Sequence, residues 1–409
     1  MRTQQLNAFT GSKLSFDEAQ EILVDSINAI TSKYRHWVFA WSGGKDSTTL
    51  VTMVMTLLDT GQIKHRPETI DVLYADTRAE LLPLHASAQI LAGQLRERGA
   101  NVHTVMAPID KRFLVYILGR GVPPPNNNTL RWCTRQIKIE PMKAKMMELY
   151  GGYNQRLLSF VGVRQGESAI RDNRISMSCS ANGTECGTGH LYEVLDTQVS
   201  DKLCPILHFR TCTVWDWLKI FAPSSLYGAW HTKLLAEAYG DYGEHSAEEQ
   251  NSRTGCNGCP LASKDQALDT LLLNPSWSYL NPLKKLREIY REMRSPVHRL
   301  RKPGGETRKD GKLSKNQNRM GPIRLESRLH FLKEINQVQA DINSAAGQEG
   351  RPPIDLVNTE EEARIRELIE NETWPQGWTG HEPQADRPFE PHFHDGTVQK
   401  NIFNTYQHV

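Results

Sequence analysis

The sequence predicts an α/β protein, a doubly wound parallel sheet followed by a helical C-terminal part. The first observation is that the apolar runs "HWVFAW", "TIDVLYADT", "VHTVMAP" and "RLLSFVGVR" alternate with helical patterns. The second is that strand-like runs give way to helical spacing within "LCPILHFRTCTVWDWLKIF". Strands that alternate with helices form parallel sheets covered by helices on both faces.

The first strand leads into a loop suited to anions. Trp37 to Trp41 is followed by the loop Ser42-Gly43-Gly44-Lys45-Asp46-Ser47, then by a helical pattern that stops at Gly61. Ligands of such sheets bind at the carboxyl ends of strands. Glycines admit a phosphate close to the backbone, while the helix N-terminus, Lys45 and the hydroxyls supply donors. The glycine spacing excludes a GxxxxGK[ST] loop. The alternative is a plain glycine turn into a buried helix.

Acidic residues follow the second strand. Asp76 and Glu80 in "ADTRAEL" stand where they could hold magnesium or a ribose. Caps on the following helix are the alternative.

Two groups of basic residues follow. Arg131, Arg135 and Lys138 recur at helical spacing around Cys133, which suits phosphate groups and predicts a lowered thiol pKa. At the predicted turn after the fourth strand, a polyphosphate site is expected, with an ordinary surface salt-bridge cluster as the alternative. The residues at this turn are Arg164, Glu167, Ser168 and Arg171.

The cysteines favour metal or redox chemistry. There are seven, an odd number at irregular spacing, which argues against a disulfide framework. Cys256 and Cys259 form a Cys-x-x-Cys pair that fits half of a zinc site, half of an iron-sulphur site or a redox dithiol. His245 could complete a zinc site, whereas His381, His392 and His394 are interpreted as scattered solvent histidines.

Charge is unevenly distributed although the net charge is only +2. Basic residues dominate from Lys284 to Lys333, which favours a polyanionic partner. A solvated helix face with a mobile loop is the alternative. The residues expected to contact DNA are Arg308, Lys309, Lys312 and Lys315.

The predicted organisation has four parts. They are an N-terminal helical segment (1–30), the nucleotide-binding α/β domain (31–220), a helical segment with cysteines and basic residues (221–345), and a C-terminal extension (346–409). No run is long enough to span a membrane, and the N-terminus lacks the apolar core of a signal peptide. We therefore expect a cytoplasmic protein without a membrane partner.

Several of these motifs resemble a known family. The hexamer SGGKDS is similar to the pyrophosphate loop of N-type ATP pyrophosphatases. With "ADTRAEL", "LRWCTRQIKIEP" and "VGVRQGESAIRDNR", the chain resembles the phosphoadenosine phosphosulfate reductase superfamily, which has an adenine-nucleotide alpha-hydrolase-like fold. "GRGVPPPNNNTLRWCTRQIKIEP" and "GVRQGESAIR" are most similar to the DndC/SspD family, the sulfurtransferases of bacterial DNA phosphorothioation. The resemblance covers roughly residues 30 to 335.

The resemblance implies an activity and a site. ATP would be cleaved to AMP and pyrophosphate, with Mg²⁺ as cofactor. The catalytic residues would be Lys45, Asp46, Arg164 and Arg171. The nucleotide would be bound by Ser42, Gly43, Gly44, Lys45, Asp46, Ser47, Asp76, Glu80, Arg131, Lys138, Arg164, Glu167 and Ser168.

The resemblance also implies a metal centre and partners. Cys133, Cys256 and Cys259 would hold a 4Fe-4S cluster, with zinc as the alternative. The fourth ligand is unknown, and Cys212 is a candidate beside Cys179, Cys186 and Cys204. The implied partners are DNA, a cysteine desulfurase that donates sulphur, and other subunits of a DNA-modification complex.

The expected function is therefore sulphur insertion into DNA after ATP has adenylated a backbone phosphate. A sulfonucleotide reductase is one alternative, but it needs a nucleophilic cysteine on a C-terminal tail, and the last cysteine here is Cys259. The other alternative is a non-catalytic subunit that senses nucleotide and binds DNA.

Overall fold

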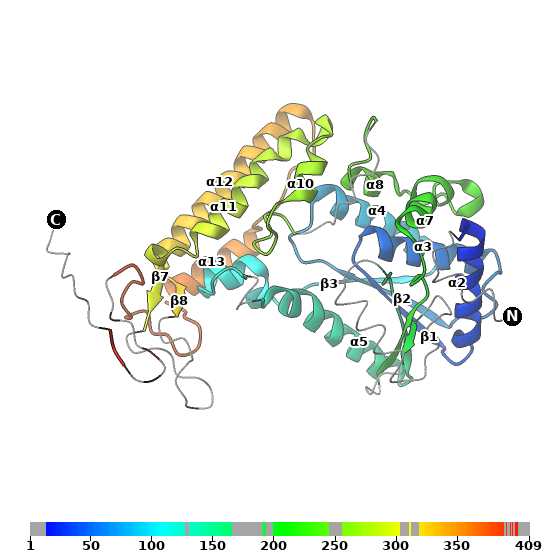
Figure 1. The fold of residues 1–409 in the computed structure, drawn as a ribbon, viewed down its shortest axis with the longest axis horizontal. Coiled ribbons are helices and arrows are strands. Elements are labelled where there is room, and N and C mark those ends of the chain that lie inside the picture. The colour runs from blue at the N-terminus through cyan, green and yellow to red at the C-terminus, as the bar shows by residue number, and fades with distance from the viewer. Residues whose placement is uncertain are drawn as a thin grey trace. The chain divides into compact units, whose positions relative to one another are not determined.

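The computed structural model forms two compact units (Figure 1). Unit 1 comprises Met1–Met106, Lys138–Cys256 and Gln266–Ser278, and unit 2 comprises Ala107–Ile137, Asn257–Asp265 and Tyr279–Val409. The structure describes residues 14–126, 131–165, 191–193, 199–244, 256–302, 311, 319–387, 390, 393, 395 and 397–399.

Unit 1 is built on a six-stranded sheet with the order β3-β2-β1-β4-β6-β5. Five strands are parallel, and β5 pairs antiparallel with β6 at the edge. The predicted doubly wound parallel sheet is confirmed, whereas the antiparallel edge strand was not predicted. The strands are β1 (His36–Trp41), β2 (Thr69–Ala75), β3 (Asn101–Val105), β4 (Leu157–Val161), β5 (Leu191–Glu193) and β6 (Ser200–Cys204).

Helices cover both faces of this sheet. Figure 1 shows α3 (Lys45–Asp59) and α4 (Leu82–Glu97) on one side and α5 (Glu140–Tyr153) on the other. Alternate residues of each strand point to opposite faces. Val38 and Leu73 accordingly pack in the core cluster beneath α5, while Phe39 stacks on Phe160 and Trp37 contacts the same ring at a tilt.

The direction in which the chain winds changes between β1 and β4. These strands are neighbours in the sheet, yet β1 leads by way of α3 to β2 on one side and β4 leads to β6 on the other. In open α/β sheets, ligands bind outside the carboxyl ends of the strands at such a switch point. The topology therefore places a binding site after Trp41 and Val161.

The other helices of unit 1 surround α3 and the sheet. Ser15 caps α2 (Phe16–Thr31) through a reciprocal capping box with Glu18. The remaining described helices are α7 (Thr211–Asp216), the π-helix η4 (Trp217–Phe221), the 3-10 helix η5 (Ser225–Tyr227), α8 (Lys233–Ala238) and α10 (Gln266–Leu271).

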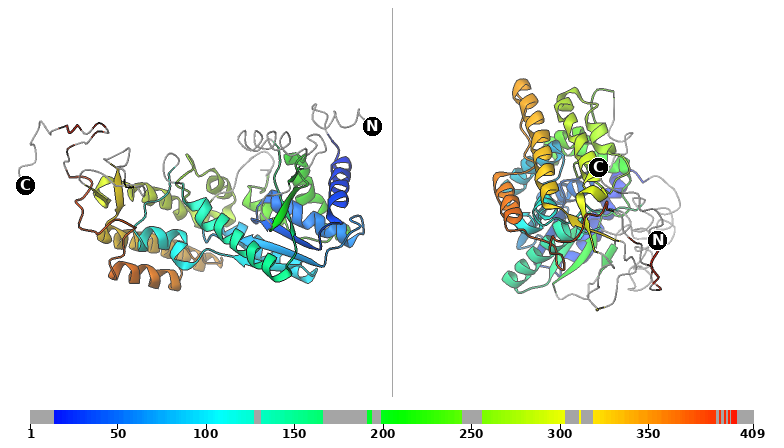
Figure 2. Two further views of the ribbon diagram at one scale, coloured as in Figure 1. Left: turned by 90° about the horizontal axis from the view of Figure 1, so that it is seen from below. Right: turned by 90° about the vertical axis from the view of Figure 1, so that its left-hand side faces the viewer.

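Unit 2 is largely helical, as predicted for the C-terminal part. Figures 1 and 2 show α11 (Lys284–Glu292) alongside the long helix α12 (Leu325–Glu349). A hairpin of β7 (Arg299–Arg301) and β8 (Met320–Ile323) joins them. The further elements are η1 (Ile109–Lys111), η2 (Val115–Gly119), η7 (Pro296–His298) and α13 (Thr359–Glu370), while η3 (Thr134–Ile139) and η6 (Pro275–Leu283) contain residues of both units.

A buried arginine holds the C-terminal segment to the rest of unit 2. Arg328 of α12 is 0% exposed and donates to the carbonyls of Ile323 (2.9 Å), Gly119 (3.0 Å) and Thr373 (2.8 Å). Its guanidinium lies 4.3 Å from the ring centre of Trp374. Burial lowers the pKa of Arg328 to about 9. Residues 373 and 374 thus belong to the same core as α12.

In the part of the chain that the structure describes, no helix combines the length and apolar character needed to cross a membrane.

Candidate active site

The glycine loop after β1 folds back on the start of α3, as expected for an anion cradle. Gly43 has φ +72°, a left-handed conformation that favours glycine, and Gly44 is the N-cap of α3. The Ser47 hydroxyl accepts from the Ser42 amide (3.2 Å) and donates to the Gly44 carbonyl (3.2 Å). These bonds curl the backbone around the start of α3, where the positive end of the helix dipole attracts an anion.

An ion pair joins this loop to the end of β4. Arg164 Nε donates to Asp46 Oδ1 at 2.5 Å, and Arg164 Nη1 donates to the Phe209 carbonyl at 3.3 Å. Both side chains of the pair are largely buried, with 6% and 15% exposed for Arg164 and Asp46. Lys45 Nζ lies 3.5 Å from the second oxygen of Asp46. Lys45 and Arg164 therefore both lie beside Asp46 at the switch point, where their positive charge suits a phosphate.

The backbone of the β4 loop lies directly against the start of α3. A Cβ added to Gly162 would be 2.9 Å from Ser47 Cα and 3.0 Å from Ser47 N. Backbone atoms cannot rotate away as a side chain can, so only glycine allows this approach. Gly162 thereby sets the separation between Arg164 and the glycine loop.

Tyr239, just after α8, is a site residue that our sequence reasoning missed. Its hydroxyl accepts from the Lys45 amide at 3.2 Å, and its ring centre lies 5.1 Å from Lys45 Nζ. The hydroxyl thus occupies the position at which a helix N-terminus binds an anion. No local motif marks Tyr239, because 194 residues separate it from Lys45.

Three tryptophans hold α3 through a row of threonines. Trp41, Trp217 and Trp230 donate their indole N–H groups to the hydroxyls of Thr48 (2.9 Å), Thr52 (2.9 Å) and Thr56 (3.0 Å) respectively. The four-residue spacing puts the threonines on one helix face. This spacing was visible in "KDSTTLVTMVMTLLDT" and could have predicted the row.

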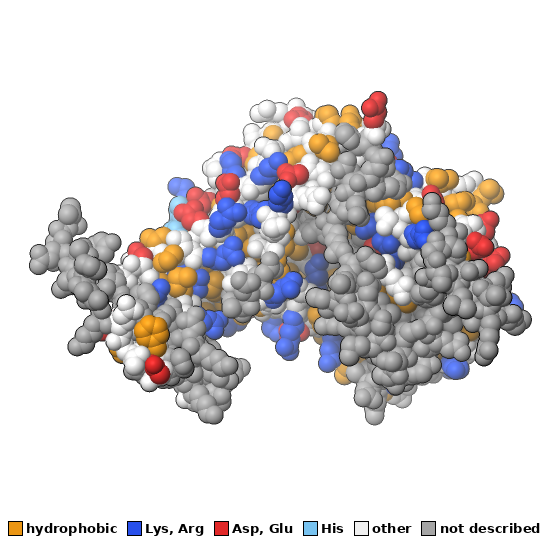
Figure 3. All heavy atoms as spheres, viewed as in Figure 1, with side chains coloured by type: hydrophobic (Ala, Val, Ile, Leu, Met, Phe, Trp, Pro, Cys, Tyr) orange, Lys and Arg blue, Asp and Glu red, His pale blue; other side chains and the backbone are white. Residues whose placement is uncertain are grey.

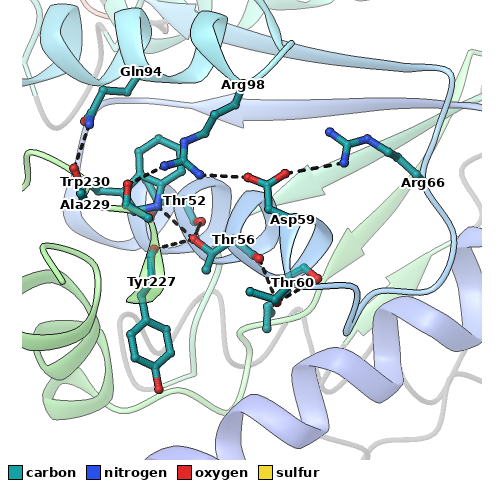
Figure 4. Close-up of polar contacts among 12 residues, drawn as sticks. Thr52, Thr56, Asp59, Thr60, Arg66, Gln94, Arg98, Tyr227, Ala229 and Trp230 are labelled. Carbon is teal, nitrogen blue, oxygen red and sulfur yellow. Dashed lines mark hydrogen bonds and ion pairs between the residues drawn. The ribbon is translucent and has the colours of Figure 1, made fainter. Parts of the chain in front are cut away.

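Figure 4 shows how this network continues at the far end of α3. Asp59 pairs with Arg98 (2.9 Å) and Arg66 (3.6 Å), and the Thr56 hydroxyl also donates to the Tyr227 carbonyl (2.8 Å). The helix that carries the glycine loop is therefore fixed along its length, so the cradle is held in place before any ligand arrives.

The acidic loop after β2 is organised around its own turn. Glu80 accepts from the Thr77 hydroxyl (2.5 Å) and amide (3.2 Å), and Asp76 accepts from the Arg78 amide (2.8 Å). Arg78 has φ +62°, an unusual value for a residue with a side chain. Burial, Glu80 and Asp76 together raise the pKa of Tyr74, so both carboxylates lie near its ring.

The predicted basic face around Cys133 is arranged differently. Residues Thr134–Ile139 form a π-helix, in which residues three and four apart no longer line up as in an α-helix. Arg131 and Arg135 are exposed in unit 2, and Lys138 belongs to unit 1. The predicted lowering of the Cys133 thiol pKa is wrong: burial raises this pKa, and Cys259 raises it further, despite hydrogen bonds with Thr134 that lower it.

The structure brings two of the predicted cysteine ligands together. Cys133 and Cys259 lie in unit 2, close enough for one thiolate to influence the other. Cys256 belongs to unit 1, where its backbone forms an isolated antiparallel β-bridge with that of Glu80. Cys212 is exposed and Cys204 is buried.

Among the residues that the structure describes, no group of three or more His, Cys, Asp or Glu could hold a metal ion. Cys179, Cys186 and His245 lie outside those residues, so the iron-sulphur cluster and the zinc alternative stay predictions. Magnesium needs only one or two carboxylates beside substrate phosphates, and Asp46 fits that role.

Several predicted site residues lie outside the described residues: Glu167, Ser168, Arg171, Cys179, Cys186, His245, His392, His394, Arg308, Lys309, Lys312 and Lys315.

Comparison with known proteins bears on this site. Residues 36–222 match the phosphoadenosine phosphosulfate reductase domain, and this segment contains all six strands, the glycine loop and Arg164. An uncharacterized protein of Methanocaldococcus jannaschii is 29% identical over 188 residues, which is 44% of this chain and 30% of that protein. The chain thus aligns with less than a third of this curated relative.

Among solved structures, a phosphoadenylyl-sulfate reductase from Candida auris, in a phosphate complex, is 12% identical. The match has a TM-score of 0.31 and covers 51% of this chain and 87% of that one.

Proposed function

We propose that this chain, whose residues 36–222 match the phosphoadenosine phosphosulfate reductase domain, cleaves ATP between its α- and β-phosphates to activate a backbone phosphate of DNA for sulphur insertion. The domain match supports the superfamily and a nucleotide as ligand. The observation that carries the proposal is the Lys45, Asp46 and Arg164 cluster beside the glycine loop at the switch point.

Each residue of the cluster has a task in this reaction. The start of α3, with Lys45, binds the β- and γ-phosphates that leave as pyrophosphate. Arg164 stabilises the charge that develops as the bond to the α-phosphorus breaks. Asp46 holds Arg164 in place and offers a carboxylate for the magnesium ion, which would neutralise phosphate charge.

Adenylation converts a non-bridging oxygen of the DNA phosphate, which is a poor leaving group, into part of AMP, which is a good one. A non-bridging oxygen of the DNA phosphate attacks the α-phosphorus, and pyrophosphate leaves. A persulfide from a cysteine desulfurase then attacks the DNA phosphorus and displaces AMP, which keeps that oxygen. Reductive cleavage of the persulfide by a thiol leaves the sulphur on DNA. No step here requires a metal cluster, and the iron-sulphur site remains a prediction.

Reaction products of purified protein incubated with ATP, duplex DNA, a persulfide donor and a thiol reductant test the ATP chemistry. AMP and pyrophosphate are expected, and ADP with phosphate as the only products would contradict the proposal. Lys45→Met and Asp46→Asn should each lower turnover on the order of 10²-fold, the usual cost of removing one preorganised charge. Lys64→Met, an exposed lysine outside the loop, serves as the control and should leave turnover unchanged.

A sulfonucleotide reductase is the second candidate, favoured by the description of the matching domain. It would release sulfite from phosphoadenosine phosphosulfate with a thiol reductant. Sulfite release at a rate above that of ATP cleavage would favour this candidate.

A further inference from the structure

One face of α11 carries a stripe of basic residues. Lys284, Arg287 and Arg291 follow one another at intervals of three and four, which places them on the same side of the helix. Arg294 extends the stripe from the turn just after the helix ends at Glu292. The apolar residues Leu286, Ile289 and Tyr290 are buried on another side. Figure 3 shows Lys and Arg side chains gathered over the region where Figure 1 draws α11, with a few acidic side chains among them.

The positive charge continues from the stripe into the hairpin. Burial lowers the pKa of Arg294, and the charge of Arg291 lowers it further. Burial also lowers the pKa of Arg299 to about 10, with contributions from Arg319 and Arg294. Among the described residues, the charges that contribute to these two shifts are those of neighbouring arginines. These arginines repel one another, and a polyanion would relieve that repulsion.

The same helix holds the loop that contains Cys259. Gly258 has φ +61°, and a Cβ there would lie 2.7 Å from Leu286 Cβ, so the loop packs tightly on α11. Arg287 donates to the carbonyls of Ala262 (2.6 Å) and Ser263. The stripe is therefore hydrogen-bonded to the segment that follows Cys259.

An aromatic cluster links Cys133 to α11 as well. Trp132 stacks on Phe113 with ring centres 5.5 Å apart, and Phe113 meets the edge of Tyr290 at 5.6 Å. Both thiols of the Cys133 and Cys259 pair are thus attached to the helix that carries the basic stripe.

We propose that the α11 stripe binds the phosphate backbone of a nucleic-acid duplex and presents it to the Cys133 and Cys259 pair. This inference rests on the proposed function for its substrate. The eleven residues from Lys284 to Arg294 span about 15 Å, that is, ten intervals of about 1.5 Å each. One strand of B-DNA has a phosphate every ~3.4 Å along its axis, so the stripe is long enough for about four phosphates. Phosphate contacts position a duplex without reading its sequence.

Other anionic partners fit this surface less well. Single strands are bound by exposed aromatic side chains, and the one aromatic residue in the stripe segment, Tyr290, is buried. A helix that binds a membrane surface needs an exposed apolar face, whereas the apolar residues of α11 are packed inside unit 2.

The test is the salt dependence of duplex binding by the full chain. Fluorescence anisotropy with a labelled duplex would compare wild type with the double variant Arg291→Gln, Arg294→Gln. The slope of log affinity against log salt should fall by roughly two, because each phosphate contact contributes about 0.9. Affinity at about 0.1 M salt should fall on the order of 50-fold.

A matched control removes the same charge elsewhere in unit 2. Lys285 and Arg366 already pair with carboxylates, Asp341 (3.1 Å) and Glu362 (2.5 Å). Lys285→Gln with Arg366→Gln should leave the slope nearly unchanged. Equal slopes for both double variants, or equally tight binding of wild type to anionic vesicles with the same sensitivity to Arg291 and Arg294, would overturn the proposal.

Cross-linking tests the position of the backbone. A duplex with a thiol-reactive group on one phosphate should modify Cys259 or Cys133 before the exposed Cys212, and the Arg291 and Arg294 variant should reduce this modification. Preferential labelling of Cys212 would contradict the proposal. Pyrophosphate release from ATP with saturating duplex is measured in parallel: its absence in wild type would contradict the proposed function, whereas a normal rate with unchanged duplex binding in the variant would contradict only this inference.

Discussion

Gly162→Ala tests whether the spacing between the β4 loop and α3 controls the reaction. The new Cβ would lie 2.9 Å from Ser47 Cα, 3.0 Å from Ser47 N and 3.1 Å from the carbonyl carbon of Asp46. Carbon atoms in contact prefer about 3.5 to 4.0 Å, so the loops must separate by roughly 0.5 to 1 Å. Overpacking of this kind costs about 1 to 3 kcal/mol.

The added methyl group would displace the residues that are proposed to contact the nucleotide. Arg164 stands two residues after Gly162, and Asp46 and Ser47 begin α3. A misplacement of about 1 Å can cost on the order of 100-fold in rate, so we expect pyrophosphate release to slow by roughly 10- to 100-fold. The assay is steady-state pyrophosphate release, with urea unfolding followed by tryptophan fluorescence.

Gly93→Ala is the matched control, because nothing lies within 4 Å of a Cβ at that position of α4. It should leave turnover unchanged and raise stability by about 0.5 to 1 kcal/mol, the usual gain for alanine within a helix. Wild-type turnover and stability for Gly162→Ala would refute the reasoning.

Two further predictions concern the support of α3 and the reactivity of a thiol. Thr52→Val leaves the buried Trp217 indole without its acceptor and should lower the free energy of unfolding by about 1 to 3 kcal/mol. The control, Thr60→Val at the exposed end of α3, should change this free energy by less than about 0.5 kcal/mol. Equal effects of the two variants in urea unfolding would argue against the tryptophan and threonine row. Because the pKa of the Cys133 thiol is raised, a smaller fraction of this thiol is thiolate at a given pH. Iodoacetamide should therefore modify Cys133 more slowly than the exposed Cys212, and the pH dependence of the Cys133 reaction should be centred above the ordinary thiol range. Faster modification of Cys133 than of Cys212, measured by peptide mass spectrometry, would contradict this prediction.

Local patterns in the sequence predicted the sheet and the glycine loop, because strand periodicity and loop chemistry are properties of adjacent residues. The loop after Trp41 is an example, since its glycines, lysine and serines stand together in the chain. The Asp46 and Arg164 pair was predicted only as two separate charges, because the two residues are 118 positions apart in the chain. The contact of Tyr239 with Lys45 was not predicted for the same reason, since these two residues are 194 positions apart.

The environment of Cys133 shows why charge in the sequence is a poor guide to pKa. Arg131 and Arg135 stand close to it in the chain, yet both are exposed to solvent, where their charge is screened. Burial of the thiol dominates instead and favours its neutral form. Burial depends on the packing of unit 2, which no local pattern in "LRWCTRQIKIEP" specifies.

The transfer of an isotope from DNA to AMP tests the central claim most directly. A duplex with ¹⁸O at the non-bridging oxygens of its phosphates would be incubated with the protein, ATP, a persulfide donor and a thiol reductant. If a DNA phosphate oxygen attacks the α-phosphorus and later leaves with AMP, mass spectrometry should find one ¹⁸O in each AMP formed together with phosphorothioate. AMP that carries no ¹⁸O while phosphorothioate accumulates would contradict the account.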